Sequence, residues 1–556
     1  MKITKTLLIF SILLFKNITC FAQWSTNTTV NNPIRVAQFA QYAPCIASDG
    51  SGGAIIVWID APDDGGIDAD IYAQRIDANG VIQWASGGVP ICTAVNEQPY
   101  AAVISDGNGG AIIAWTDGRA SDTDIYAQKI NASGVVQWAN NGVPICTALG
   151  YNFGPFMVSD GNGGAIIAFS DRRNDPNLAD IYAQSINASG IVQWATDGIV
   201  ICGNPATSFS PQIVSDGNNG AIITWHDNRN GNFDIFAQRV NPSGILQWTN
   251  DGMPVCTAPG PQTSSSLISS PNGDAIIAWS DGRNTATSAA DIYAQCVNSN
   301  GIVQWPTNGV MICDAINNQN VPLLVSDGNN GGIIVWEDLR TAVNSADVYA
   351  QRINSAGMVQ WAASGIGIST TTNNQRYCKI ISDQNGGAII TWQDERLGVS
   401  SSDIYAQRIS SNGIVQWTTN GAPVSTATNI QRNPFMVSDG NAGAIITWGD
   451  NRAVTNYDVY AQRINTSGTL ATEMQTVSNG VHVFPNPSNG LVTFQSTGNI
   501  TTISIMNQLG ETVYKDTCVN HNNKELDVTN VSNGMYFYTI ISDSNIITNG
   551  KLIIAH

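Results

Sequence analysis

Short β-branched and aromatic runs alternate with polar turn segments along most of the chain. Around the stretch from Ser105 to Trp138, the apolar runs cover residues 100–105, 111–116, 125–130 and 135–146. The segments between them are rich in Asp, Gly, Asn and Ser, which tolerate positive φ angles or cap turns, whereas β-branched and aromatic residues favour strands. This pattern predicts four antiparallel strands within the stretch.

The four-run pattern recurs along the chain. Each copy begins with Ser-Asp-Gly or a close variant, and successive starts lie 54 to 57 residues apart. The starting residues are Ser48, Ser105, Ser159, Ser215, Ser269, Ser326, Ser382 and Ser438. A repeat of this length that holds four strands is typical of one blade of a β-propeller. We therefore expect an all-β fold.

The two ends of the repeat array complement each other. The last copy contains Ser438 and Trp448 but lacks the Gln-Trp pair that the other copies have, and Gln23-Trp24 precedes the first copy instead. An N-terminal strand that completes the last blade removes the free edges of a ring and has no use in an open solenoid. The sequence thus predicts an eight-bladed β-propeller of four-stranded blades over residues 23–470, closed by the N-terminal strand.

One loop of each copy varies in length. From the aromatic residue of the second run to the Asp of Asp-Ile-Tyr, the separation ranges from nine residues (Trp115 to Asp124) to twelve (Trp58 to Asp70). A loop that is free to vary is where a scaffold usually carries function. We expect a ligand to bind on the face that carries this loop.

A Trp-x-Asp-x-Arg motif precedes the variable loop in most copies. Its carboxylate and guanidinium groups suit polar ligands such as glycans. The candidate ligand-binding residues are Asp117, Arg119, Asp171, Arg173, Asp227, Arg229, Asp281 and Arg283. An enzyme site is usually one asymmetric constellation, so repetition favours a structural role instead, in which each Arg braces the loop by pairing with the Asp beyond it.

Other signals of chemistry are few. Of the four histidines only His226 lies in the array, where we expect an exposed loop residue. The Asp-Gly-Asn-Gly-Gly segment at residues 106–110 is similar to the start of a calcium loop, but a whole strand separates it from Asp117, so we expect a turn and no metal. Catalysis by carboxylates alone, as in glycosidases, stays open.

The composition limits the partners and the compartment. With 24 Lys and Arg against 42 Asp and Glu, the net charge of −18 disfavours binding to nucleic acid or anionic membranes. Residues 1–22 have the positive start, short apolar run and small residue of a secretory signal peptide, and no later run is long enough to span a membrane. Cys92, Cys146, Cys202, Cys256 and Cys313 occupy equivalent places in successive copies, too far apart to bridge, so we expect them to be free and buried. No pairing is assigned to the other cysteines.

The segment from Ala127 to Trp138 resembles the tryptophan-docking motif of quinoprotein-like eight-bladed propellers. Its turn is one residue shorter, and Ser or Asn stands where that family favours Thr. The resemblance implies that each tryptophan wedges between adjacent blades. The equivalent residues are Trp24, Trp84, Trp138, Trp194, Trp248, Trp305, Trp361 and Trp417. Because no motif for holding a cofactor accompanies them, we expect none.

The repeat stops after Leu470, and residues 471–480 are predicted to be a linker. Residues 481–556 contain four ordered motifs, with Pro485, Asn486, Pro487 and Gly490 in the first, Gly510 in the second, Gly534 and Tyr536 in the third, and Lys551 in the last. They resemble the type A C-terminal sorting domain of the type IX secretion system of Bacteroidetes, although Ala555-His556 is an unusual ending. The resemblance implies a small Ig-like sandwich, recognition by the secretion machinery, and release or attachment at the outer cell surface.

The leading expectation is a secreted or surface-displayed propeller that binds a glycan or a protein without chemistry of its own. The alternative is a carbohydrate-active hydrolase or lyase that uses carboxylates. The sequence names no ligand.

Overall fold

The computed structural model describes residues 24–61, 68–270, 272–284, 289–342, 345–453, 456–470, 481–484, 488, 490–507, 511–516, 521–542 and 547–554. The chain divides into two compact units, Met1–Ala471 and Thr472–His556. The predicted signal peptide and linker lie outside the described residues.

The described part of the first unit contains eight four-stranded antiparallel sheets and one short 3₁₀ helix, η1 (Val399–Ser401). The first four sheets consist of β2 (Gln41–Ser48), β3 (Ala54–Asp60), β4 (Asp70–Ile76) and β5 (Val89–Cys92); β6 (Ala102–Ser105), β7 (Ala111–Asp117), β8 (Asp124–Ile130) and β9 (Val143–Cys146); β10 (Asn152–Ser159), β11 (Ala165–Asp175), β12 (Leu178–Ile186) and β13 (Ile199–Cys202); β14 (Ser208–Ser215), β15 (Ala221–Asp227), β16 (Asp234–Val240) and β17 (Met253–Cys256).

The other four sheets consist of β18 (Gln262–Ser269), β19 (Ala275–Asp281), β20 (Asp291–Val297) and β21 (Val310–Cys313); β22 (Gln319–Ser326), β23 (Gly332–Ala342), β24 (Ser345–Ile353) and β25 (Ile366–Ser369); β26 (Gln375–Ser382), β27 (Ala388–Asp394), β28 (Asp403–Ile409) and β29 (Ala422–Ser425); β30 (Gln431–Ser438), β31 (Ala444–Asp450) and β32 (Asp458–Ile464) with β1 (Asn32–Arg35). The expected all-β architecture of four-stranded sheets is confirmed.

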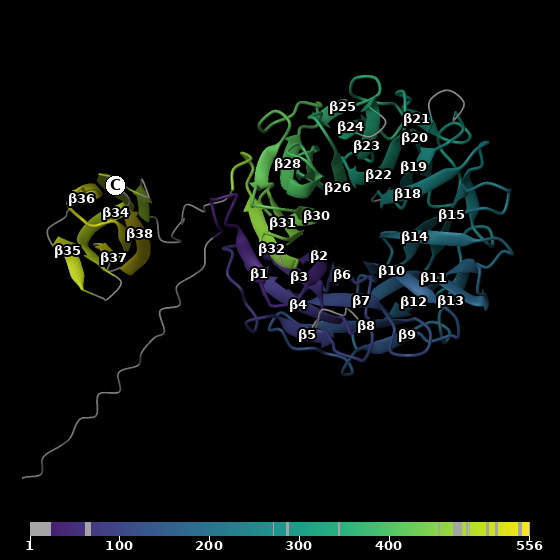
Figure 1. The fold of residues 1–556 in the computed structure, drawn as a ribbon, viewed down its shortest axis with the longest axis horizontal. Coiled ribbons are helices and arrows are strands. Elements are labelled where there is room, and N and C mark those ends of the chain that lie inside the picture. The colour runs from purple at the N-terminus through teal and green to yellow at the C-terminus, as the bar shows by residue number, and fades with distance from the viewer. Residues whose placement is uncertain are drawn as a thin grey trace, which may run out of the picture. The chain divides into compact units, whose positions relative to one another are not determined.

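The sheets surround a common centre, with the first strand of each sheet innermost (Figure 1). Each first strand contacts the first strands of the sheets before and after it, and β30 contacts β2. The last sheet takes its fourth strand from the start of the chain, since β1 pairs antiparallel with β32 and aligns Pro33 with Tyr460. This arrangement is typical of a β-propeller.

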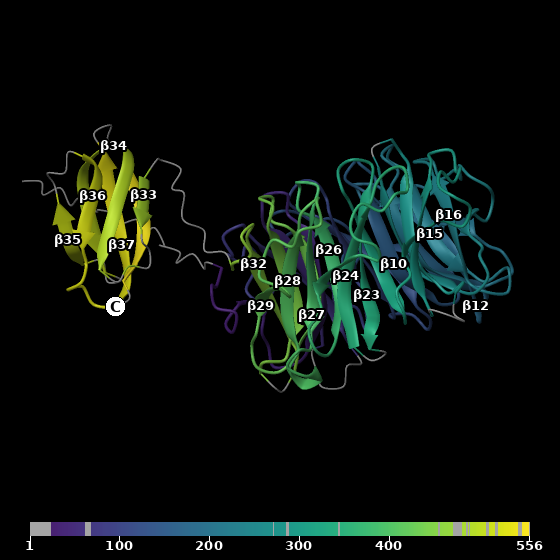
Figure 2. The same cartoon turned by 90° about the horizontal axis from the view of Figure 1, so that it is seen from above.

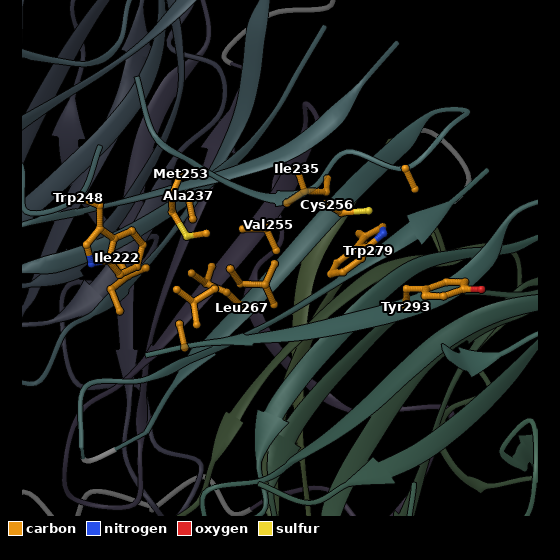
Figure 3. Packing of buried hydrophobic residues seen from close by; sticks show 14 residues of the cluster. Ile222, Ile235, Ala237, Trp248, Met253, Val255, Cys256, Leu267, Trp279 and Tyr293 are labelled. Carbon is orange, nitrogen blue, oxygen red and sulfur yellow. The ribbon is translucent and has the colours of Figure 1, made fainter. Parts of the chain in front are cut away.

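The apolar core lies between successive sheets. All seven residues of β3 and of β7 are buried, because both faces of a second strand are covered by neighbouring sheets. Figure 3 shows one such cluster, in which Trp248 and Met253 from one sheet meet Leu267 and Trp279 from the next. Such a run of apolar residues without alternation is what burial on both faces requires.

The Gln-Trp tryptophans join neighbouring sheets. The indole N–H of Trp84 donates to the carbonyl of Ala132 in the following repeat at 3.0 Å, and its ring lies on Gly134, where a Cβ atom would come within 2.7 Å. Trp24 makes the equivalent hydrogen bond to Ala78 at 2.9 Å. The other six do the same with Ala188, Pro242, Ser299, Ser355, Ser411 and Thr466. That these tryptophan contacts stabilise the fold stays a prediction.

The second unit is built on one six-stranded sheet. Its strands are β33 (Val481–Phe484), β34 (Leu491–Met506), β35 (Thr512–Asp516), β36 (His521–Asp527), β37 (Gly534–Ser542) and β38 (Ile547–Ile554). The long strand β34 pairs with β33, β35, β36 and β37, and Figure 2 shows it beside β36 and β37. Its core includes Val492, Phe494 and Tyr538.

Four residues of the predicted sorting motifs are described. Gly534, Tyr536 and Lys551 lie on β37 and β38, and Gly490 directly precedes β34. The buried Tyr536 donates its hydroxyl to the carbonyl of Ser532 at 2.8 Å. Pro485, Asn486, Pro487 and Gly510 lie outside the described residues.

Candidate functional site

The Trp-x-Asp-x-Arg motif forms the same buried network in successive repeats. Asp117 accepts the indole N–H of Trp115 at 2.7 Å, and Arg119 donates Nε to Asp117 at 2.7 Å and Nη2 to the carbonyl of Asn141 at 2.8 Å. The guanidinium also lies 3.8 Å from the ring centroid of Tyr126. Asp117 is fully buried. The network therefore ties the end of the second strand to the outer part of its own sheet.

The other candidates repeat this geometry. Ion pairs join Asp171 to Arg173, Asp227 to Arg229 and Asp281 to Arg283, and all three aspartates are fully buried. The expected pairing of each Arg with the Asp beyond the loop is wrong, because its carboxylate partner is the Asp two residues before it. Trp225 departs from the pattern, since Asp227 accepts from Ser208 and Asn204 instead. Direct contact of these pairs with a ligand stays a prediction.

The recurrent cysteines belong to the same network. Arg119 Nη2 lies 3.3 Å from the sulfur of Cys92, and burial raises the pKa of that thiol to about 11. All eight cysteines in the described part of the chain are free and buried, as expected for the five recurrent ones. A thiol with a raised pKa is a poor nucleophile at neutral pH.

The Asp of Asp-Ile-Tyr lies opposite the motif aspartate, as in the aligned pair Asp117 and Asp124. Burial and the nearby Asp122 and Asp117 raise the pKa of Asp124 to about 6. In the seventh sheet, burial and Asp394 raise the pKa of Asp403 to about 7. These carboxyl groups recur in every repeat, so by themselves they define no single site.

The Ser-Asp-Gly segments are turns, as expected. Asp49 Oδ1 accepts the backbone N–H groups of Ser51 and Gly53 at 2.8 Å each, and its other oxygen pairs with Arg75. No group of three or more His, Cys, Asp or Glu suited to a metal ion occurs among the described residues.

The first strand of each sheet contains an irregularity next to the centre. The third residue of seven first strands has a positive φ angle, for example 51° in Val321 and 55° in Tyr377. The equivalent residue of the second sheet, Tyr100, has a φ angle of 55° and lies two residues before β6. The register shifts at this point in the seven first strands whose pairing spans it, such as between Arg376 and Lys379. Tyr100 and Tyr377 are 69% and 52% exposed. Such bulges with strained backbone are over-represented next to binding sites.

The middle residue of Trp-x-Asp reaches this irregularity in the next sheet. The carboxylate of Glu337 accepts the backbone N–H of Tyr377 at 2.7 Å. Thr116 and Gln393 make the equivalent contacts to Gly154 and Asn433 at 3.3 and 3.4 Å. Seven residue types occupy this position in the eight repeats, namely Ile59, Thr116, Ser170, His226, Ser280, Glu337, Gln393 and Gly449. This position therefore distinguishes the repeats near the centre.

His226 occupies this middle position and is not the exposed loop residue expected from the sequence. Its side chain is buried, with edge-on contacts to Phe209 and Phe233 at centroid distances of 4.2 and 5.5 Å. Burial lowers its pKa to about 4. It is therefore neutral at physiological pH.

Glu337 belongs to a group of titratable side chains that does not recur in the other repeats, together with Arg376 and Lys379. Burial raises its pKa, while the Tyr377 N–H, Arg376 and Lys379 oppose that shift. Burial also lowers the pKa of Lys379, whose Nζ lies 4.6 Å from the ring centroid of Phe435. Our sequence reasoning missed Glu337, although the sequence contains a signal. Only three glutamates occur in the array, Glu97, Glu337 and Glu395, whereas its aspartates recur.

The C-terminal unit matches a known family. Residues 482–555 match the secretion system C-terminal sorting domain. The protein is therefore cargo of the type IX secretion system and is exported to the cell surface or secreted. No helix in the described residues is long and apolar enough to cross a membrane. The chain matches no curated protein.

The repeat array is similar to solved propeller-like enzymes. An α-L-arabinanase of Penicillium chrysogenum complexed with arabinobiose is 12% identical to this chain, with a TM-score of 0.32. The match covers 57% of this chain and 94% of the arabinanase. An α-L-arabinofuranosidase of Fusarium graminearum is 12% identical to this chain, with a TM-score of 0.32. The match covers 60% of this chain and 98% of the arabinofuranosidase. A puromycin-hydrolysing peptidase of Mycobacterium tuberculosis is 9% identical to this chain, with a TM-score of 0.40. The match covers 77% of this chain and 61% of the peptidase. At these values the likeness identifies no functional residue of this chain.

The comparisons correct our leading expectation of function. We expected a binding or adhesion module without chemistry, but the neighbours include an α-L-arabinanase, an α-L-arabinofuranosidase and a family-43 glycoside hydrolase. The alternative was a carbohydrate-active hydrolase or lyase that uses carboxylates, and its hydrolase form agrees better with these neighbours.

Proposed function

We propose that the eight sheets are the blades of a closed eight-bladed β-propeller that spans residues 23–470. The pairing of β1 with β32 and the contact of β30 with β2 support this closure. Residues 471–480 are the linker, residues 481–556 form an Ig-like sandwich recognised by the secretion machinery, and residues 1–22 are a signal peptide.

We propose further that the propeller is a carbohydrate-active hydrolase in which Glu337 is the general acid. One observation carries this proposal: Glu337 is a carboxyl group with a raised pKa beside the exposed Tyr377, at the position that differs between repeats. A glycosidase needs a carboxyl group that is still protonated at the working pH, so that it can protonate the departing glycosidic oxygen.

Glu395 is the candidate for the second carboxylate. It belongs to the repeat after Glu337, and it accepts the amide N–H of Asn374 at 2.7 Å. Glycosidases pair the acid with a carboxylate that acts as nucleophile or activates water. A fixed hydrogen bond from Asn374 orients Glu395 for either task.

The test is the release of reducing ends from a panel of polysaccharides by the full secreted chain. We expect turnover of at least one polysaccharide, and a loss of about 100-fold or more in Glu337→Gln, which keeps the shape but cannot donate the proton. Glu97→Gln removes a glutamate that is exposed in another repeat and serves as the matched control. The absence of turnover on the whole panel, or full activity in Glu337→Gln, contradicts the proposal.

A further inference from the structure

Most cationic side chains of the array have a carboxylate partner. Fourteen ion pairs join array Arg or Lys residues to aspartates in the described residues, as between Arg239 and Asp216 at 2.9 Å. Paired charges of this kind cancel locally, and all of them except Arg35 with Asp60 join residues of the same repeat. They leave little charge for a ligand.

Four cations of the array differ. Among the described residues, Arg172, Arg376, Lys379 and Arg432 form no ion pair, and their side chains donate no hydrogen bond. Arg432 instead lies with its Cζ 3.6 Å from the ring centroid of Tyr457, and Lys379 lies over Phe435. Packing over an aromatic ring steadies a cation but leaves its N–H groups available to an incoming anion.

Three of these four lie on two neighbouring first strands at the centre of the array. Arg376 and Lys379 are on β26 and Arg432 is on β30, and these two first strands contact each other (Figure 1). The other six first strands contain no Lys or Arg. We call Arg376, Lys379 and Arg432 the inner cationic cluster. It is a local concentration of positive charge in a chain with a net charge of −18.

Two members of the inner cationic cluster lie near the proposed acid. Arg376 and Lys379 are close enough to Glu337 to influence its pKa, and Tyr377 lies between them on the same strand with its ring half exposed. An exposed aromatic ring suits the apolar face of a sugar, and unpaired guanidinium and ammonium groups suit a carboxylate or a sulfate. Both kinds of group thus meet at one place.

We propose that the substrate is an anionic polysaccharide, whose carboxylate or sulfate groups bind the inner cationic cluster while Glu337 faces the glycosidic bond. This inference rests on the proposed hydrolase function and names its substrate class. A neutral polysaccharide is then a poor substrate.

Titration calorimetry of the full chain carrying Glu337→Gln tests the proposal. This variant is used because it binds the ligand without consuming it. The probes are an oligogalacturonate with carboxylates, a dextran sulfate with sulfate esters, and a neutral arabinan. We expect one of the two charged probes to bind, more weakly at higher salt, and the neutral probe not to bind. The charged probe that binds identifies the anionic group.

Removing the inner cationic cluster distinguishes specific recognition of charge from non-specific binding. Arg376→Gln, Lys379→Gln and Arg432→Gln together are expected to weaken binding of the charged probe by about tenfold or more. These side chains have no ion pair to lose, so the melting temperature is expected to change little. For the single Arg432→Gln, the matched control is Lys515→Gln, an exposed lysine of the C-terminal unit, which leaves binding unchanged.

The outcomes distinguish the two proposals. Unchanged binding in the triple variant, or a preference for neutral arabinan, overturns the proposed substrate class. If the protein hydrolyses that neutral arabinan, the proposed hydrolase function still holds. Charge-dependent binding without turnover of any probe by the unmodified chain overturns the hydrolase and keeps the recognition of anions.

Discussion

At the scale of single residues, carboxyl groups that look alike in the sequence have different environments. Asp117 is held by Arg119 and Trp115, whereas Asp403 is buried opposite Asp394. Glu337 differs again, because its carboxylate bonds to the backbone of a neighbouring sheet. Charge partners and burial, rather than residue type, therefore decide which carboxyl group keeps a proton near neutral pH.

Asp403 makes stability depend on pH. Its pKa of about 7 in the folded chain exceeds the usual value of about 4 in an unfolded chain. The folded state therefore holds a proton that the unfolded state has lost, so stability is full below about pH 4 and falls as the pH rises towards 7. We expect Asp403→Asn to raise the melting temperature above that of the unmodified protein by more at pH 8 than at pH 5. The same difference at both pH values contradicts this account, and the exposed Glu97→Gln is the control.

Backbone strain at the inner strands is a second property of single residues. Val321 is β-branched and 45% exposed, yet it has a φ angle of 51°. A left-handed conformation costs an L-residue roughly 1 to 2 kcal/mol, which glycine avoids. We expect Val321→Gly to raise the melting temperature and Val325→Gly, at an ordinary φ on the same strand, to lower it. A melting temperature of Val321→Gly at or below that of the unmodified chain contradicts the strain.

At the scale of elements, the sequence predicts strands well where composition alone sets them. The second run, residues 111–116, becomes β7, and the third becomes β8, because their β-branched residues are covered on both sides. The fourth run, residues 135–146, is a strand only over β9, since its first part forms an isolated bridge through Val136 and a turn.

The inner irregularity and the candidate site were harder to predict. Tyr, Val and Ser carry the positive φ angle in different repeats, so no residue type marks it. His226 and Glu337 are both flanked by Trp and Asp, yet one packs in an aromatic cluster and the other bonds to the backbone of Tyr377. Packing between repeats that are distant in sequence decides this, and a single repeat does not contain that information.

The contacts between sheets depend on the Gln-Trp tryptophans. Trp248 is 9% exposed, and its ring fits against Gly301. We expect Trp248→Ala to lose about 3 to 5 kcal/mol of stability, because it removes a large buried ring and leaves a cavity. Thermal melting measures the loss. Trp248→Phe, which keeps a ring but loses the hydrogen bond to Ser299, is the milder comparison, and an unchanged melting temperature in Trp248→Ala contradicts the docking role.

At the scale of the whole molecule, one unit directs export and the other contains the candidate site. Residues 482–555 match the sorting domain, so removing residues 481–556 is expected to trap the chain in the periplasm. Cell fractionation followed by immunoblotting measures this. A truncated chain that still reaches the surface or the medium contradicts the role of the C-terminal unit, and Glu97→Gln in the full chain controls for expression.

The central claim is that Glu337 donates a proton to the departing sugar oxygen. Polysaccharides have poor leaving groups that need this proton, whereas dinitrophenyl glycosides of the same sugar leave without it. The most direct measurement is therefore kcat/KM of Glu337→Gln on both substrates. The account predicts a loss of about 100-fold or more on the polysaccharide and a loss of only a few-fold on the dinitrophenyl glycoside. Equal losses on the two substrates, or no loss on either, contradict it.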